Sequence, residues 1–212
     1  MKIIVFLGPS LPLNEAKNII SVEYRPPAGR GDVLKAMDEG AKIIGLIDGV
    51  FYQRAAVSHR EILSAIKNGV MVIGGGSIGA IRASELDIYG MIGVGEIYKW
   101  YKQGKIIGDD EVAVAFHPIT YQPISEALVN IRATLDFIKN MGKISEEEVN
   151  LILRIAKETP FYLRSYNRIL QKAILELGKE RVKEIAELVN YNKIDQKKLD
   201  SIEVLKKIKS II

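Results

Sequence analysis

The residues best suited to chemistry form a glycine-rich stretch before the middle of the chain. Gly75-Gly76-Ser77-Ile78-Gly79 matches the G-x-S-x-G pattern of a nucleophile elbow, with a predicted strand before it and a predicted helix after it. Flanking glycines would let the serine occupy a tight turn with its hydroxyl exposed. Amide groups at the start of the helix could donate to an oxyanion. The pattern predicts acyl transfer with a serine nucleophile.

The same stretch is open to other interpretations. Glycine-rich turns between a strand and a helix also cap helices, bind phosphate or simply allow close packing. Residues 74–79 fit the dinucleotide spacing G-x-G-x-x-G, but no acidic residue clearly ends a strand about twenty residues later. A P-loop lysine pattern is absent from the sequence. A serine nucleophile is therefore one of several hypotheses for this turn.

A serine nucleophile needs a base, and the sequence holds two histidines, His59 and His117. The first lies near the start of a predicted helix, and the second directly follows a predicted strand. Asp48, which ends another predicted strand, could orient a histidine or accept amide hydrogens of its own turn. Each histidine could equally be structural and hold a loop carbonyl. We take Ser77, His59 and Asp48 as the candidate catalytic residues.

Charged side chains follow the serine on the predicted helix. Arg82 and Glu85 are three positions apart, so they could form a surface ion pair worth a few tenths of a kcal/mol. Alternatively, the guanidinium could grip a carboxylate or thiocarboxylate. The acidic cluster at 109–111 is either a solvated loop or a site for a cation or a basic partner. The candidate substrate-binding residues are Ser10, Gly75, Gly76, Gly79, Arg82, Glu85 and His117.

These residues need a scaffold, and the apolar pattern predicts one. Strands are expected at 3–7, 22–24, 42–47, 70–73 and 111–116, and helices at 13–19, 32–39, 57–68, 78–86 and 95–103. Short apolar strands separated by helices indicate a mostly parallel, Rossmann-like α/β sheet covered on both faces. Sites in such sheets form at the carboxyl ends of the strands. The positions after the strands, at 8–10, 48–49, 74–77 and 117, should therefore gather at one edge.

The strand pattern ends after about residue 124. A long helix is predicted at 125–141, a capping box begins at Ser145 with Glu148, and Thr159-Pro160 should start a further helix. We therefore divide the chain into an α/β core at 1–123 and an all-helical C-terminal region at 124–212.

Composition narrows the classes of function. The 212 residues are 48% hydrophobic, and the absence of cysteine excludes a thiolate metal site or a persulfide on this chain. Two histidines with scattered acids give no metal signature, so we predict no metal. Residues 1–142 hold 15 basic and 15 acidic side chains, and residues 143–212 hold 15 basic and 11 acidic ones, so the positive surplus lies in the tail. The sequence shows no basic segment interspersed with aromatic residues, which argues against nucleic-acid binding. No apolar run reaches membrane length, and we interpret residues 3–7 as a strand rather than a secretion signal, so we expect a cytoplasmic protein.

Several motifs together resemble the TfuA family. They are FLGPSL at 6–11, PPA at 26–28 with GD at 31–32, LIDGVF at 46–51, AVSHREIL at 56–63, GGGSIGAIRASE at 74–85, GMIGVG at 90–95 and DDEVA at 109–113. The resemblance covers roughly residues 3–133 and leaves out the helical tail. Ile78, Arg60 and Gly108 depart mildly from the residues that the family more often has at these places.

The resemblance implies a partnership. TfuA-like proteins work beside YcaO enzymes, which use ATP to activate a backbone amide for thioamidation, so this chain itself needs no cofactor. The TfuA-like protein is thought to release sulfide from a thiocarboxylated, ubiquitin-like carrier of the ThiS type. The product is a thioamidated peptide or, in methanogens, a thioglycine of methyl-coenzyme M reductase. The lysine-, isoleucine- and glutamate-rich composition suits a thermophilic archaeon.

Three hypotheses follow from this resemblance and from the motif. The first is a hydrolase that acts on a protein thiocarboxylate, with Ser77 as nucleophile, His59 as base, Asp48 as its orienter and Arg82 on the carrier's tail. The second is a subunit that docks on YcaO without catalysis, and the third is a stand-alone serine hydrolase. The sequence leaves the oligomeric state open, a homo-oligomer included.

Overall fold

The fold is given by a computed structural model that describes residues 1–50 and 54–212. Two compact units are present: residues 1–109 together with 197–212, and residues 110–196. The sequence placed a single division after residue 123, whereas these units divide the chain twice. Across the described residues, no helix combines the length and the apolar character needed to cross a membrane.

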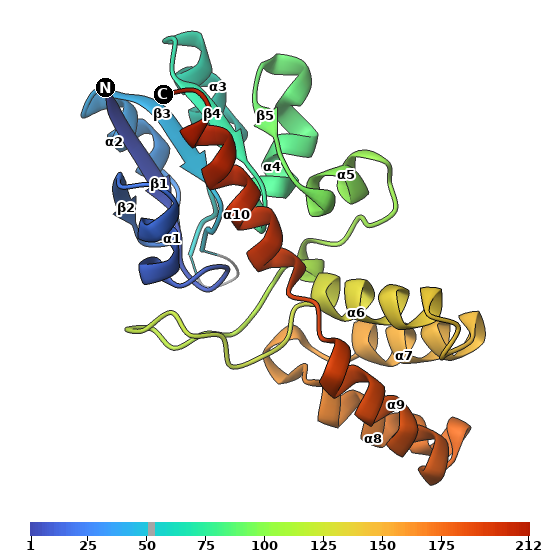
Figure 1. The fold of residues 1–212 in the computed structure, drawn as a ribbon. Helices are drawn as coiled ribbons and strands as arrows, with labels where there is room; N and C mark the ends of the chain where they lie inside the picture. The colour runs from blue at the N-terminus through green and yellow to red at the C-terminus, as the bar shows by residue number, and fades with distance from the viewer. Residues whose placement is uncertain (51–53) are drawn as a thin grey trace. The chain divides into compact units, whose positions relative to one another are not determined.

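The first unit contains a five-stranded, fully parallel sheet, which confirms the predicted α/β class (Figure 1). Its strands are β1 (Lys2–Phe6), β2 (Glu23–Arg25), β3 (Ala41–Leu46), β4 (Met71–Gly74) and β5 (Ile92–Gly93), in the spatial order β2-β1-β3-β4-β5. This order reverses direction between β1 and β3, so the carboxyl ends of these two strands form the topological switch point.

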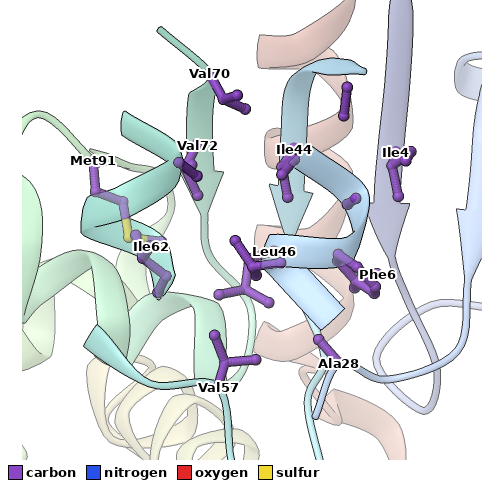
Figure 2. Close-up of a cluster of buried hydrophobic side chains, with 14 of the residues drawn as sticks. Ile4, Phe6, Ala28, Ile44, Leu46, Val57, Ile62, Val70, Val72 and Met91 are labelled. Carbon is purple, nitrogen blue, oxygen red and sulfur yellow. The ribbon is translucent and has the colours of Figure 1, made fainter. Parts of the chain in front are cut away.

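Three helices cover one face of the sheet. They are α2 (Asp32–Asp38), α3 (His59–Lys67) and α4 (Ile78–Leu86). Alternate residues of the central strands, Ile4, Phe6, Ile44, Leu46 and Val72, meet side chains such as Ile62 of α3 in one buried cluster (Figure 2). This packing fixes the amino ends of α3 and α4 at the carboxyl edge of the sheet.

The other face is covered by helices from opposite ends of the sequence. They are α1 (Leu13–Ile19) and α10 (Gln196–Lys209). Ala16 of α1 and Val204, Leu205 and Ile208 of α10 pack in a second buried cluster with the residues of β1, β3 and β4 that point to this face. Gly45 of β3 allows this approach, because a Cβ there would come within 2.8 Å of Ile208 Cδ1. α10 therefore belongs to the α/β unit, and Figure 1 shows it running along the sheet.

The second unit is helical, as the sequence predicted for most of this region. Its helices are α6 (Leu128–Asn140), α7 (Glu146–Glu158), α8 (Tyr166–Leu177) and α9 (Lys179–Asn192). Each packs against the next, and α6 also contacts α9, so the four enclose an apolar core. The capping box predicted at Ser145 is present: its hydroxyl accepts the Glu148 N–H, and the Glu148 carboxylate accepts the Ser145 N–H at 2.7 Å.

Three local predictions differ from the structure. The strand predicted at 111–116 is wrong: a 3-10 turn, η2 (Asp109–Glu111), begins this stretch, and a single bridge joins Phe116 to Pro123. The short strand β5 was not predicted. The helix start predicted at Thr159-Pro160 is also wrong: Pro160 precedes a second 3-10 turn, η3 (Phe161–Leu163), and the next helix, α8, begins at Tyr166. The helices predicted at 13–19 and 78–86 are confirmed at their predicted bounds.

Candidate active site at the carboxyl edge of the sheet

A buried carboxylate links the two strand ends at the switch point. Asp48, which is 1% exposed, follows β3, and its Oδ2 accepts the backbone N–H groups of Gly8 and Ser10 at 2.9 and 3.0 Å. The Ser10 hydroxyl donates to Oδ1 at 2.6 Å. The first and third strand ends are therefore joined through these two side chains. All the hydrogen bonds given for the carboxylate go to this loop and none to a histidine of the described chain.

The glycines around Ser77 let α4 approach the sheet closely. A Cβ on Gly79 would overlap the carbonyl oxygen of Leu46 in β3, and a Cβ on Gly75 would overlap the carbonyl oxygen of Val94. Gly76 has φ +71°, a left-handed conformation that glycine adopts at little cost. Close packing, which was one interpretation of the motif, therefore explains Gly75 and Gly79.

Ser77 occupies the N-cap of α4 but does not cap it. Its side chain makes no capping hydrogen bond, it is 7% exposed, and its hydroxyl bonds to no other described residue. The backbone N–H groups of Ser77 and Gly79 are already used by the carbonyls of Gly75 and Ile47, at 2.8 and 3.2 Å. The N–H groups of Gly76 and Ile78 donate to no described residue. Within the described residues, this buried turn therefore leaves a hydroxyl and two amide groups without a partner.

His59 belongs to a charged group on the neighbouring helices. Its Nε2 lies 2.8 Å from Oε2 of Glu85, and the same oxygen accepts from Nη1 of Arg82 at 2.7 Å. Arg82 also donates from Nε to the Val57 carbonyl at 2.9 Å. The predicted Arg82–Glu85 pair is thus present, and the carboxylate serves the imidazole as well. The His59 and Glu85 side chains are 49% and 38% exposed, so the group is open to solvent.

A capping box fixes His59 at the first position of α3. The Ser58 hydroxyl accepts the Glu61 N–H, and the Glu61 carboxylate accepts the Ser58 N–H at 2.6 Å. The second Glu61 oxygen accepts the N–H of Gly31 at 2.9 Å, which ties α3 to the start of α2. Serine followed three residues later by glutamate is a visible signal for this cap, although the sequence analysis did not use it.

The structure brings some predicted residues together and leaves others apart. Ser10 joins Asp48, and Arg82 and Glu85 join His59, but no hydrogen bond links Ser77 to either histidine within the described chain. Glu85 lies eight residues after Ser77, or about 12 Å along a helix, so the His59 ring that it binds is about two turns of α4 away from the serine. Asp48 does not contact His59 by any hydrogen bond of the described residues. The imidazole–carboxylate pair in this structure is His59 with Glu85.

His117 lies in the other compact unit. It begins a turn in which its Nδ1 accepts the N–H groups of Ile119 and Thr120, both at 3.3 Å, and its carbonyl accepts the Tyr121 N–H at 2.9 Å. The strand expected before it is absent, so the expectation that it follows a strand of the sheet is wrong. In this structure its ring acceptor serves its own turn.

The acidic cluster at 109–111 is partly structural. Glu111 is 2% exposed and accepts two hydrogen bonds of 2.8 Å from Arg132. The Asp110 carboxylate accepts a hydrogen bond of 2.9 Å from the buried guanidinium of Arg164. Two members of the cluster are thus neutralised by arginines of the helical unit. Searched over the described residues, the structure gives no group of three or more histidine or acidic side chains able to hold a metal.

Fold and site together define a doubly wound α/β protein whose polar side chains gather where the strands end. A family model described as TfuA-like protein matches residues 48–165, which is more than half of the chain. The chain therefore belongs to the TfuA-like family, as the resemblance of its motifs predicted. The match includes Ser77, His59, Arg82 and Glu85 and continues into the helical unit. A search of curated proteins found no match. Membership of this family is consistent with a role beside a YcaO enzyme.

Proposed function

We propose that this protein works with a YcaO enzyme in backbone thioamidation and releases sulfide from a thiocarboxylated carrier of the ThiS type. The family match supports the partnership. The observation that carries the chemistry is the Ser77 hydroxyl at the start of α4, which, like the backbone N–H groups of Gly76 and Ile78 on either side of it, bonds to no described residue.

The reaction is an acyl transfer with sulfide as leaving group. The Ser77 oxygen attacks the thiocarboxylate carbon, the C–S bond breaks, and hydrosulfide leaves as an acyl-serine ester forms. Water then hydrolyses this ester to the carrier's carboxylate and restores the serine. The N–H groups of Gly76 and Ile78 stabilise the oxyanion of each tetrahedral intermediate, as paired backbone donors do in other acyl transferases.

His59 is the base in this proposal. It takes the Ser77 proton and returns a proton to the leaving sulfur, and Glu85 holds its ring in position. In this structure Glu85 holds the ring about two helical turns along α4 from Ser77, so the imidazole must move to the serine, or reach it through a water, when the carrier's tail binds. Arg82, held by the Val57 carbonyl, supports the same carboxylate.

The test is sulfide release from purified thiocarboxylated carrier by the full chain. Ser77→Ala should lower kcat by at least about a thousandfold, as loss of a nucleophile does. The matched control is Ser84→Ala on the same helix, whose hydroxyl only donates to the Ile81 carbonyl and whose loss should leave the rate unchanged. A Ser77→Ala protein that releases sulfide at the parent rate would remove the serine from the chemistry.

A second function has one observation in its favour. Without a hydrogen bond between Ser77 and His59 among the described residues, the chain could act as a subunit that docks on YcaO and raises its activity without catalysis. In that case Ser77→Ala would still stimulate a YcaO enzyme supplied with free sulfide. Stimulation that survives this change while sulfide release is lost would show that both functions reside in one chain.

A further inference from the structure

Three exposed arginines lie near the carboxyl edge of the sheet, two of them in loops and one in the first turn of α3. The Arg30 backbone N–H donates to the Ala55 carbonyl at 2.9 Å, which places its segment against the one that carries Arg54. The Arg54 Nη2 lies 3.4 Å from the point that a Cβ on Gly29 would occupy. Arg60 directly follows His59 in the first turn of α3. We call Arg30, Arg54 and Arg60 the arginine surface; all three are exposed.

None of these guanidinium groups is neutralised within the described chain. They form no ion pair and donate no side-chain hydrogen bond to a described residue, whereas Arg25, Arg82, Arg132, Arg154, Arg164 and Arg181 all pair with carboxylates. Residues 51–53 are phenylalanine, tyrosine and glutamine, which carry no charge that could offset them. The arginine surface therefore keeps its full positive charge.

The acids nearest in the fold are engaged elsewhere. Asp32 accepts the Gly29 N–H at 2.7 Å, and the two oxygens of Glu61 accept the backbone N–H groups of Ser58 and Gly31. Glu85 is shared by His59 and Arg82. None of these carboxylates forms an ion pair with Arg30, Arg54 or Arg60 among the described residues, so the three guanidinium groups keep donors for a ligand from outside.

We propose that the arginine surface binds acidic side chains of the protein that delivers its C-terminal tail to Ser77. This inference rests on the proposed function and adds the chemistry of the partner's surface. Exposed charges of one sign steer an oppositely charged partner and raise its rate of association, and this effect weakens with salt. Because all three side chains lie outside the reacting group, they should affect binding of the carrier and not the rate of the chemical step.

The direct test is fluorescence anisotropy with the full chain and a fluorescein-labelled peptide of alternating glutamate and alanine. The triple variant Arg30→Glu, Arg54→Glu, Arg60→Glu should weaken binding at least roughly tenfold, and raising the salt from about 50 to 300 mM should weaken binding to the parent chain. A peptide with glutamine in place of glutamate should not bind. The matched control is Arg168→Glu, an exposed arginine of the helical unit, which should bind like the parent.

Equal binding of the glutamate peptide to the triple variant and the parent would overturn the proposal, and so would equal loss in the Arg168→Glu control. Binding of the glutamine peptide as tight as that of the glutamate peptide would do the same, because it would show that carboxylates are not what the surface recognises. All these side chains are exposed, so circular dichroism should show that each variant remains folded.

A kinetic measurement separates this inference from the proposed function. In the sulfide-release assay the triple variant should raise KM at least roughly tenfold with kcat unchanged, whereas Ser77→Ala lowers kcat. If the triple variant behaves like the parent while Ser77→Ala is inactive, the inference that the arginine surface binds the carrier is wrong, and the proposed hydrolase function is supported. If no variant releases sulfide, the anisotropy experiment still decides whether an acidic partner binds here.

Discussion

Asp48 illustrates how one residue can look catalytic in a sequence and serve the fold. It ends a strand at the switch point, where active-site acids are common, yet both of its oxygens are bound by the loop after β1. The imidazole finds its carboxylate in Glu85 instead, 26 positions away in the chain. The i,i+3 spacing predicted the Arg82–Glu85 pair, but contacts between separate helices have no spacing signal, so the third member could not be predicted.

Two substitutions distinguish the roles of Asp48. Asp48→Ala leaves the buried Ser10 amide, the half-buried Gly8 amide and the Ser10 hydroxyl without an acceptor and should lower the free energy of unfolding by about 3 kcal/mol. Asp48→Asn keeps an oxygen for the amides and should retain most of the stability, as urea unfolding would show. Sulfide release by Asp48→Asn should stay within about threefold of the parent; a loss near 10⁴-fold, as for the orienting acid of a triad, would return Asp48 to the catalytic group.

At the scale of elements, the buried strands were the most predictable part. β1, β3 and β4 are short runs of isoleucine, valine and leucine, and the structure has strands within or next to their predicted ranges. β5 has only two residues, one of them glycine, so its sequence gives no strand pattern. Residues 112–115 alternate valine and alanine and Phe116 follows, but this stretch forms a single bridge, because pairing depends on a neighbour that local sequence does not specify.

The contact between α4 and β3 gives a second prediction. Gly79→Ala should cost at least about 3 kcal/mol of unfolding free energy, since its Cβ would overlap backbone of β3 that cannot move aside easily. Gly104→Ala is the control: Gly104 has φ +70° but nothing within 4 Å of an added Cβ, so it should cost only about 1 kcal/mol of conformational strain. Equal losses in thermal or urea unfolding would mean that close packing is not why residue 79 is glycine.

At the scale of the whole molecule, the α/β unit is built from two separate segments of the chain. Residues 197–212 follow the helical unit in the sequence but pack on the sheet, where Val204, Leu205 and Ile208 are buried. The predicted helical region at 124–212 includes α10, since an amphipathic pattern does not specify which surface a helix will cover. The shared buried cluster and the close approach of Ile208 to Gly45 show which surface α10 covers.

Removal of side-chain volume from α10 should therefore destabilise the sheet. Ile208→Ala deletes a fully buried side chain and should lower the free energy of unfolding by about 2–5 kcal/mol. Hydrogen exchange should show faster opening of amides in β1 and β3, which lie beneath it, and little change in α7. The exposed Leu175→Ala, at 91% exposure in α8, is the control. Unchanged exchange in β3 would mean that α10 contributes little to the sheet.

The late position of α10 has a consequence for synthesis on the ribosome. Sheet strands made first must wait, with the part of one apolar face that α1 does not cover left open, until helices α6 to α9 of the other unit have been translated. The helical unit can complete its core during that interval, because its sequence is continuous. In a cell, nascent chains of this protein should thus engage chaperones through the face formed by Ile43, Ile47 and Ile73, and release them once α10 emerges.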